Sequence, residues 1–476
     1  SRGLGDVYKR QLLSNEIVFW VSWIIIPLIM EIVPAVAGFF LLVKKRILYK
    51  KDAPLIYYPP VTLIVPVYNS ADTLYACLDS IRNSDYQPEQ LDVLLVNNGS
   101  KDNSFEIYTA YQKEHPQMNL KWMNSEQGKS RALNMALFHA EGKYIIHIDS
   151  DGILHPEALS NLVKRFEAHN ELHCMTGTIL TNPEMIKAEK NPFRRIFQKT
   201  EFYEYAQAFL AGRNFEAELN SIFTMSGAFS AFRKSTILKT QLYNTETVCE
   251  DTHVTFQVRK LLHQKIAICE NAVFFVDPIE NLQKLCLQRQ RWQRGELEVA
   301  HMFMDRGSVV KGFLTNFMTR VIMFDHTFAF PRMIWYFALI CLTFLNYPFS
   351  FILISLVLIY ILYVLSAFLY YLNILSYLGY DKKLRRFYAG NVLILLLLPF
   401  YNFVIYWFRM AGILNSIKTT GAWRTQTWKE EWEQVKCVVC HDFAWLISWH
   451  KGVKKLTYKE EKHEEKQETA QGGQSV

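Results

Sequence analysis

The chain has 476 residues, 50% of them hydrophobic, and a formal net charge of +7. This length leaves room for two or three domains, and the modest charge is not gathered into the long basic patch that nucleic-acid binding requires, so we expect no nucleic-acid partner. The basic residues lie beside apolar stretches instead, at 44–46 and 382–386, as in membrane-flanking loops on the cytoplasmic side. Eight cysteines at no regular spacing indicate reduced thiols in a cytosol-facing protein.

The N-terminal part joins a segment of uncertain origin to one long apolar run. Residues 1–16 do not begin with Met, and residues 1–11 show no apolar periodicity, which is compatible with a fragment or an assembly artefact. Residues 17–43 are apolar almost throughout and end at a basic group. The run is long enough to cross a bilayer with some tilt, so it predicts a transmembrane helix whose C-terminal end lies in the cytoplasm.

From Val61 the pattern changes to strands that alternate with helices. Apolar runs rich in β-branched residues predict strands over Val61–Val67, Asp92–Val96 and Tyr144–Ile148. The segments between them predict helices over Ala71–Arg82, Ser104–Glu114 and Gly128–Ala140. This order is typical of an α/β fold with a Rossmann-like, doubly wound and mostly parallel sheet, which binds a nucleotide at the carboxyl ends of its strands.

Two carboxylates, Asp149 and Asp151, follow the predicted strand in the run KYIIHIDSDG. Residues i and i+2 of an extended segment share a face, so both can hold a hard cation and the diphosphate bound to it. An ordinary Asp/Gly turn is the simpler explanation of these residues taken alone. The motifs around them favour the metal site.

The motifs VTLIVPVYNSADTL, VNNGSKDNS, QGKSRALNMAL and IDSDG, followed by Met225–Phe229 and Cys249–Asp251, resemble in order and spacing the family-2 glycosyltransferases with a GT-A fold. Gln288–Trp292 matches the Q-x-x-R-W signature of the membrane-embedded synthases of cellulose, hyaluronan, chitin and poly-N-acetylglucosamine. The resemblance covers about residues 55–300, which we expect to form a GT-A catalytic domain.

The resemblance implies a seat for a sugar nucleotide at the ends of the first strands. The implied binding residues are Pro66, Tyr68, Asn69, Asn97, Asn98, Lys129, Arg131 and Asp149. Asn97 stands where the family usually has the Asp that holds a uracil ring, although an amide carbonyl can also pair with a uracil edge. Asp149 and Asp151 are the implied ligands of Mg²⁺ or Mn²⁺, since their oxygen donors suit a hard cation. Turn chemistry is the other explanation of the Asn residues, and a solvated charge that of Lys129 and Arg131.

For the transfer step the resemblance implies Asp251 as the base that deprotonates the acceptor hydroxyl, with Glu250 supporting it or competing for the role. His253 is the alternative base. No second carboxylate stands out as a nucleophile, so we predict direct displacement with inversion. The residues implied at the acceptor and diphosphate are Gln288, Arg289, Arg291 and Trp292. The simpler alternative is a helix with a core Trp and solvated Arg residues.

Beyond residue 300 the chain is predicted to be largely membrane-associated. Residues 305–330 predict interfacial helices, and residues 331–411 predict spans at Pro331–Asn346, Phe349–Leu372 and Ala389–Met410. Residues 412–476 predict an amphipathic and then disordered tail. One N-terminal span plus these three puts the tail outside, whereas 421–428 resembles cytosolic gating segments of such synthases. A re-entrant segment, an N-terminal hairpin or an external tail would each resolve this.

The tail also contains Cys437, Cys440 and His441 in the spacing of a covalent haem attachment site. Packed or palmitoylated cysteines are the simpler explanations. The side of the membrane on which these residues lie stays open.

Together these features predict a membrane-bound inverting glycosyltransferase in the cell membrane, multi-pass, with a cytoplasmic catalytic domain. Its expected partners are a nucleotide-sugar donor, predicted to be UDP-linked, a polysaccharide or lipid-linked acceptor, the lipid bilayer and an accessory membrane subunit. An acceptor site just before membrane helices indicates processive synthesis with export. The alternative is a non-catalytic membrane scaffold or transport subunit that keeps the nucleotide-binding fold, but binding alone would not need the base Asp251.

Overall fold

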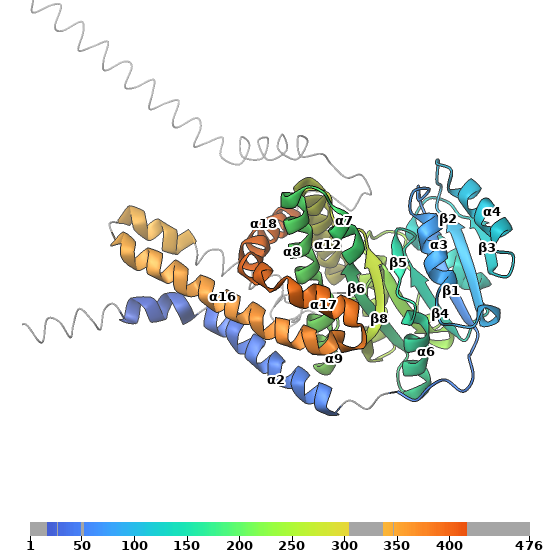
Figure 1. Cartoon of the computed structure of the whole chain (residues 1–476), viewed down its shortest axis with the longest axis horizontal. Coiled ribbons are helices and arrows are strands. Elements are labelled where there is room, and N and C mark those ends of the chain that lie inside the picture. Colours follow the sequence, from blue (N-terminus) through green and yellow to red (C-terminus); the bar gives the residue numbers. More distant parts are fainter. Residues whose placement is uncertain (1–16, 26, 49–51, 304–336, 346, 417–476) are drawn as a thin grey trace, which may run out of the picture. The chain divides into compact units, whose positions relative to one another are not determined.

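The computed structural model describes residues 17–25, 27–48, 52–303, 337–345 and 347–416. In this part of the chain an eight-stranded sheet has the order β3-β2-β1-β4-β7-β6-β8-β5 (Figure 1). The strands are β1 (Val61–Val67), β2 (Leu91–Asn97), β3 (Asn119–Asn124), β4 (Tyr144–Ile148), β5 (Gly152–Leu154), β6 (Cys174–Thr181), β7 (Phe229–Arg233) and β8 (Ile266–Val276).

The predicted α/β fold is confirmed, but the sheet is mixed where we predicted it to be mostly parallel. The strands β3, β2, β1 and β4 are parallel neighbours, and β6 is parallel to β8. In contrast, β7 runs antiparallel to both β4 and β6, and β5 antiparallel to β8. The strands past residue 150 were not predicted. β3 was missed as well, because this edge strand, NLKWMN, is polar and largely exposed and lacks the apolar run of a buried strand.

Helices pack on both faces of the parallel half, which explains why its inner strands β1, β2 and β4 are apolar at most positions. Leu63 and Val65 of β1 pack with α3 (Leu74–Arg82), α4 (Ser104–Glu114) and α6 (Ala158–Ala168), while Ile64 packs with α5 (Lys129–His139) and α11 (Glu250–Lys260). Successive side chains of a strand point to opposite faces, so both sets must be apolar. The carboxyl ends of β1, β2 and β4 therefore stay at one edge, between the two helical layers.

The second half adds α7 (Pro183–Ala188), α8 (Pro192–Tyr205), η3 (Ala206–Gly212), α9 (Arg213–Glu218), α10 (Lys234–Ile237) and α12 (Leu282–Met302). Among them α8, η3, α9 and α12 contact the apolar N- and C-terminal helices, whereas α10 packs on β7. The short η2 (Pro88–Gln90) precedes β2 in the first half. The helix α12 packs closely on α18 (Leu398–Ser416): a Cβ at Gly412 would lie 3.0 Å from Gln290 Cα.

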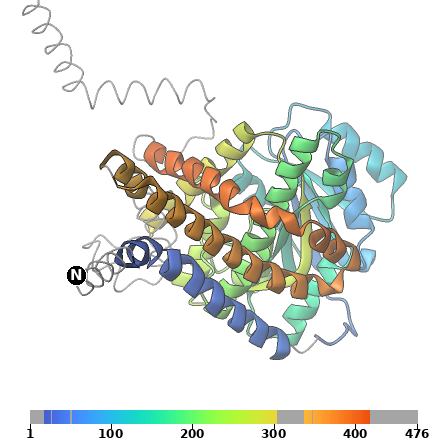
Figure 2. The same cartoon turned by 60° about the vertical axis from the view of Figure 1, so that its left-hand side comes forward.

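The apolar helices are η1 (Leu28–Ile32), α2 (Val33–Leu48), η4 (Leu342–Leu345), α16 (Phe349–Tyr377), η5 (Leu378–Tyr380), η6 (Val392–Leu396) and α18. The polar helix α17 (Lys382–Gly390), which contains four basic residues, connects η5 to η6. Among the described residues one helical stretch, Phe349–Tyr380, is long and apolar enough to cross a membrane. It contains the predicted span 349–372 and runs beyond it. Figure 2 shows α2 lying along α16, and the two helices are in contact.

Of the other membrane predictions, one is wrong, one stays a prediction and the rest fall mainly outside the described residues. The predicted span Ala389–Met410 is wrong as one helix, because α17 ends at Gly390, η6 follows, and α18 starts at Leu398 with Pro399 in its first turn, where proline is tolerated. The span 17–43 is helical where described but passes through the π-turn η1, and it stays a prediction. Residues 305–330, positions 331–336 and 346 of the predicted span 331–346, and the tail from 417 lie outside the described residues. The tail includes Cys437, Cys440 and His441.

Candidate active site

Lys129 lies where the ends of β4, α5 and α11 meet. Its Nζ is 2.5 Å from Asp149 Oδ1 and 3.6 Å from Glu250 Oε1, and it donates to the Gly227 carbonyl at 3.2 Å. Burial opposes the charge of Lys129, but the carboxylates of Asp149 and Glu250 outweigh it and raise the lysine pKa. The lysine is therefore a permanent cation between two acids far apart in sequence.

The loop before α5 presents this lysine. Gly128 has φ +138°, a backbone conformation that residues with a side chain rarely adopt. Its N–H donates a hydrogen bond to the Asn98 side-chain carbonyl. Lys129 is then the first residue of α5. Asn98 thus positions the loop.

Asp149 and Asp151 flank the buried Ser150, whose hydroxyl is 2.7 Å from the Ser70 hydroxyl. Partial burial and the negative charge of Asp149 raise the pKa of Asp151 to about 6. The two carboxylates are thus close enough to repel each other, and a bound cation would reduce this repulsion.

These acids fit a hard divalent cation. Mg²⁺ in phosphate-transfer sites typically uses one or two carboxylates, with further ligands from substrate phosphates and water. Within the described residues no group of three or more His, Cys, Asp or Glu side chains forms a metal cage. A cation here would therefore depend on oxygens of the bound diphosphate, as a transient donor complex requires.

Asp251 is held next to the same lysine. Its carboxylate accepts from the Gly227 N–H at 2.9 Å and from the Thr252 N–H at 2.7 Å, and the Gly227 carbonyl accepts from Lys129. A Cβ at residue 227 would lie 2.8 Å from Asp251 Oδ2, so the close approach needs glycine. Burial raises the pKa of both Asp251 and Glu250, with Lys129 opposing the shift. The structure thus brings Asp149, Glu250 and Asp251 around Lys129.

His253, the alternative base, lies elsewhere. Residues two apart on a helix do not share a face, and the ring nitrogens of His253 face Gln257 Nε2 at 2.9 Å and Asn244 Nδ2 at 3.3 Å. Burial lowers the pKa of this histidine. The structure therefore does not support His253 as the base.

The residues predicted to seat the nucleoside mostly shape loops. Asn69, at φ +49°, accepts from the Lys101 N–H at 2.9 Å, and Asn97 accepts from the Ser100 N–H at 2.8 Å while donating to Asn124 at 3.0 Å. Pro66 is buried within β1. Tyr68 is exposed, and its hydroxyl accepts from Gln127 at 3.3 Å.

Of two further residues, Asp102 lies at this edge and Arg131 does not. Asp102, which the sequence prediction missed, accepts from the Ala71 N–H at 2.8 Å and from the Ser104 hydroxyl at 2.6 Å, tying the two loops together. The Asp-x-Ser spacing before α4 is a helix-start pattern that would have found it. Arg131 pairs with Glu126 at 2.6 Å on the exposed side of α5, so the structure does not bring it to the acids.

The Q-x-x-R-W segment lies on α12. Arg289, predicted near the diphosphate, is buried instead: it donates to Glu204 at 2.7 Å and its guanidinium lies 4.4 Å from the Trp292 ring centroid. Gln288 donates to the Tyr205 hydroxyl at 3.4 Å. Arg291, by contrast, is exposed. The periodicity of the helix separates these neighbours, because residues 289 and 291 point to different faces.

Trp292 is half-buried, with its ring 6.0 Å from Phe209 in an edge-to-face arrangement. One turn farther, Gly295 packs against Cys249, where a Cβ would collide with the sulfur. This contact sets α12 against the start of α11, next to Glu250 and Asp251.

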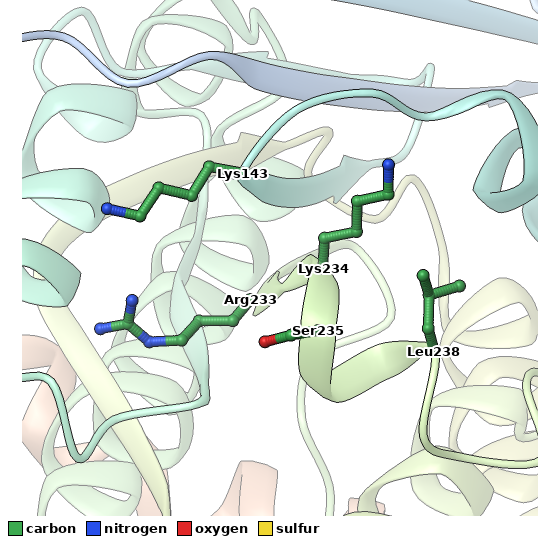
Figure 3. A pocket seen from close by; sticks show the side chains of 5 residues that line it. All are labelled: Lys143, Arg233, Lys234, Ser235 and Leu238. Atoms are coloured by element: carbon green, nitrogen blue, oxygen red, sulfur yellow. The ribbon is translucent and has the colours of Figure 1, made fainter.

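A recess of about 400 Å³ lies at the other end of the sheet (Figure 3). It is lined by Lys143, Arg233, Lys234, Ser235 and Leu238. Lys143 precedes β4 and Arg233 ends the antiparallel β7, so the recess is at the opposite end of these strands from Asp149. Arg233 is also engaged, donating to the carbonyls of Phe166 and Leu172, each at 2.6 Å. We therefore do not assign the recess to the site.

Comparisons with known proteins agree with this arrangement. Residues 62–239 match the family model "Glycosyl transferase family 2". A poly-beta-1,6-N-acetyl-D-glucosamine synthase of Staphylococcus epidermidis is 24% identical over 369 residues, 74% of this chain and 82% of that protein. A synthase of the same name from Staphylococcus aureus strain MSSA476 is 25% identical over 269 residues, so the match spans 56% of this chain and 60% of that relative.

A solved mannosyltransferase of Pyrobaculum calidifontis, in complex with GDP-Man and Mn²⁺, superimposes with a TM-score of 0.56 at 18% sequence identity. The match covers 85% of this chain and 98% of that one. At this identity the likeness concerns the fold, and it agrees with a GT-A-like α/β sheet.

Proposed function

We propose that the protein is an inverting transferase that moves a sugar from a nucleotide donor to a polysaccharide or lipid-linked acceptor at the membrane, and the match of residues 62–239 to the model "Glycosyl transferase family 2" supports this. The observation that carries the proposal is the grouping of Asp149, Glu250 and Asp251 around Lys129. Such a grouping offers both charge compensation for a leaving diphosphate and a carboxylate base.

In the proposed step the acceptor oxygen attacks the anomeric carbon and Asp251 takes the hydroxyl proton. The bond from that carbon to the diphosphate oxygen breaks, and the diphosphate leaves with the electron pair. Lys129 offsets the charge that develops on it. Asp149 and Asp151 would hold Mg²⁺ or Mn²⁺, which supplies Lewis-acid stabilisation of the same charge. A single displacement inverts the anomeric centre.

The donor we propose to test first is a UDP-linked N-acetylhexosamine. Curated relatives are named for a polymer of N-acetyl-D-glucosamine, which supports this sugar. Asn97 is engaged with Ser100 and Asn124, so the nucleobase would meet a loop that is already ordered. GDP-linked donors are the comparison, since the structural neighbour was solved with GDP-Man and Mn²⁺.

We also propose a multi-pass protein of the cell membrane with its catalytic domain on the cytoplasmic side, extending a glycan processively for export with an accessory membrane subunit. The apolar α16, with α2 along it, supports the membrane location. The contact of α12 with α18 supports a short path from the acceptor side to the apolar helices. Products of one added sugar on defined acceptors would contradict processivity.

The decisive experiment compares the wild-type protein with Asp251→Asn in membranes supplied with the donor and Mn²⁺. Loss of the base should lower transfer by about 10²- to 10⁴-fold while donor binding persists. The matched control is Asp79→Asn, an exposed acid paired with Arg82 on α3, which should transfer normally. Undiminished turnover in the Asp251 variant would remove the base assignment.

A further inference from the structure

Residues 183–199 form a protruding corner made of α7 and the first half of α8, which we term the basic corner. Each helix starts with Asn followed by Pro. Asn182 accepts from the Glu184 N–H, and Asn191 accepts from the N–H groups of Phe193 and Arg194. These caps hold the corner in a defined shape.

The tip of the corner exposes large apolar side chains. Residues 191–196 are all exposed, and Phe193 keeps 83% of its surface accessible, with Ile196 and Met185 nearby. The second half of α8 is different, since Phe202 and Tyr203 are fully buried. The tip is therefore not needed for the core, and a rigid, exposed phenylalanine calls for another explanation.

The charge of the corner is unbalanced. It carries five basic residues and two acids. Glu184 and Glu189 pair with Lys187 and Arg194, at 2.8 and 3.4 Å. That leaves the three cations Lys190, Arg195 and Lys199, for which the described residues provide no salt bridge. Burial, with a smaller contribution from the neighbouring Arg195 charge, lowers the pKa of Lys199.

The corner adjoins the apolar helices. Phe197 of α8 lies 5.7 Å, ring to ring, from Tyr401 of α18, and α8 also contacts η6 (Figure 1). Leu393 of η6 and Phe400 of α18 are exposed, and Phe400 lies 5.4 Å from Tyr360 of α16. An apolar surface thus leads from the candidate membrane span to the corner.

We propose that the basic corner is a second membrane contact of the protein, in which Phe193 and Ile196 enter the headgroup region and Lys190, Arg195 and Lys199 bind anionic lipid headgroups. Exposed aromatic and aliphatic residues flanked by cations are the chemistry that recognises such a surface. The proposal rests on the membrane placement of α16 proposed above. Together the two contacts would restrict the tilt of the catalytic domain more than α16 alone.

The test uses the full chain reconstituted in vesicles, with an environment-sensitive fluorophore on Phe193→Cys and with Cys341, Cys437 and Cys440 replaced by Ser. The other five cysteines that the structure describes are buried. The matched control carries the label at Phe138→Cys, an equally apolar position that is 73% exposed on α5. In vesicles with phosphatidylglycerol, the label at 193 should emit at shorter wavelength and be quenched by spin-labelled lipid, and the label at 138 should do neither.

A second variant, Lys190→Gln/Arg195→Gln/Lys199→Gln, tests the charge. It should lose the difference in emission between phosphatidylglycerol and phosphatidylcholine vesicles. The proposal is overturned if the labels at 193 and 138 show the same emission and quenching. It is also overturned if the label at 193, in the protein that retains all three cations, emits alike in phosphatidylglycerol and phosphatidylcholine vesicles. Extraction of the protein by alkaline carbonate would instead show that α16 does not span, which separates that failure from failure of the corner.

Discussion

Lys129 would have two roles in the proposed site. Its Nζ lies 2.5 Å from Asp149 Oδ1, so its charge opposes a cation at that carboxylate. A donor diphosphate would offer the lysine a second anion and would weaken its pairing with Asp149. A cation and a donor would then bind together more readily than either alone, because each removes a cost of binding the other.

This competition predicts a split effect for Lys129→Gln. Mn²⁺ should bind the donor-free protein about fivefold more tightly, since a repelling charge worth roughly 1 kcal/mol is removed, while transfer falls about tenfold or more. Electron paramagnetic resonance of free Mn²⁺ measures the first effect and product formation the second. Arg82→Gln removes an equal charge from an exposed pair with Asp79 and should change neither. Weaker Mn²⁺ binding by Lys129→Gln would contradict the competition.

The pH dependence follows from Asp251. Burial raises its pKa, and the base must be ionised to accept a proton, so kcat should fall as the pH drops, beginning above the pH at which an ordinary aspartate protonates. The profile is to be measured at saturating donor and Mn²⁺. Because the charge of Lys129 lowers the pKa of Asp251, Lys129→Gln should move the acidic limb to higher pH. If the acidic limb of the pH profile does not move in Lys129→Gln, the group that titrates there is not Asp251.

At the scale of elements, the junction of α8, α12 and α18 combines packing with buried charge. Glu204 pairs with Arg289 at 2.7 Å, whereas the neighbouring Glu201 is fully buried, and one of its oxygens accepts from the Ile279 N–H at 2.9 Å. Burial raises the pKa of Glu201 to about 8. The folded protein therefore keeps a proton on Glu201 at neutral pH, which the unfolded chain would release.

This proton makes stability depend on pH in a defined direction. The contribution of Glu201 is fully present below the unfolded pKa of 4.5 and is lost as the pH rises to the folded value of about 8. Glu201→Gln should thus increase the free energy of unfolding at pH 8 by up to a few kcal/mol and raise the melting temperature there. Near pH 4.5 it should change both little. Thermal unfolding in detergent measures this, with the exposed Glu106→Gln as control. An equal shift at both pH values would rule out the buried proton.

At the scale of the whole molecule, α16 and its continuation decide how the protein meets the membrane. The 29 residues of α16 measure roughly 43 Å at 1.5 Å per residue, more than the hydrocarbon core of a bilayer. The catalytic segments contact its C-terminal half, where Tyr371 packs with Tyr388 and Ile374 is fully buried. The helix would therefore hold the sheet near its C-terminal end, with its N-terminal end on the far side.

This arrangement predicts opposite accessibility of the two ends. In intact cells a membrane-impermeant maleimide should label Tyr347→Cys, which precedes α16, and should reach Lys382→Cys, which follows η5, only after permeabilisation. Both variants are made without Cys341, Cys437 and Cys440. Labelling of both positions, or of 382 alone, in intact cells would contradict a single crossing by α16 with a cytoplasmic catalytic domain.

Several elements could be predicted to the residue. The observed bounds of β1, α4 and β4 equal the predicted ones, and the predicted helix at 128–140 corresponds to α5. These elements have a strong local signal, either a continuous apolar run or a helical pattern bounded by turn residues. The signal fails where burial is one-sided or polar, as in β3, and where a helix is divided by local geometry, as between α17 and α18.

The sequence by itself determined that Asp149, Asp151 and Asp251 stand at the ends of regular elements, because periodicity is a local property of neighbouring residues. The tertiary structure alone decided which side chain each of them meets. It brought Lys129 between Asp149 and Glu250, and it turned Arg289 inward onto Glu204 while leaving Arg291 exposed. Pairings of this kind depend on how distant segments pack, and burial, not residue type, then sets whether a charge is available for chemistry.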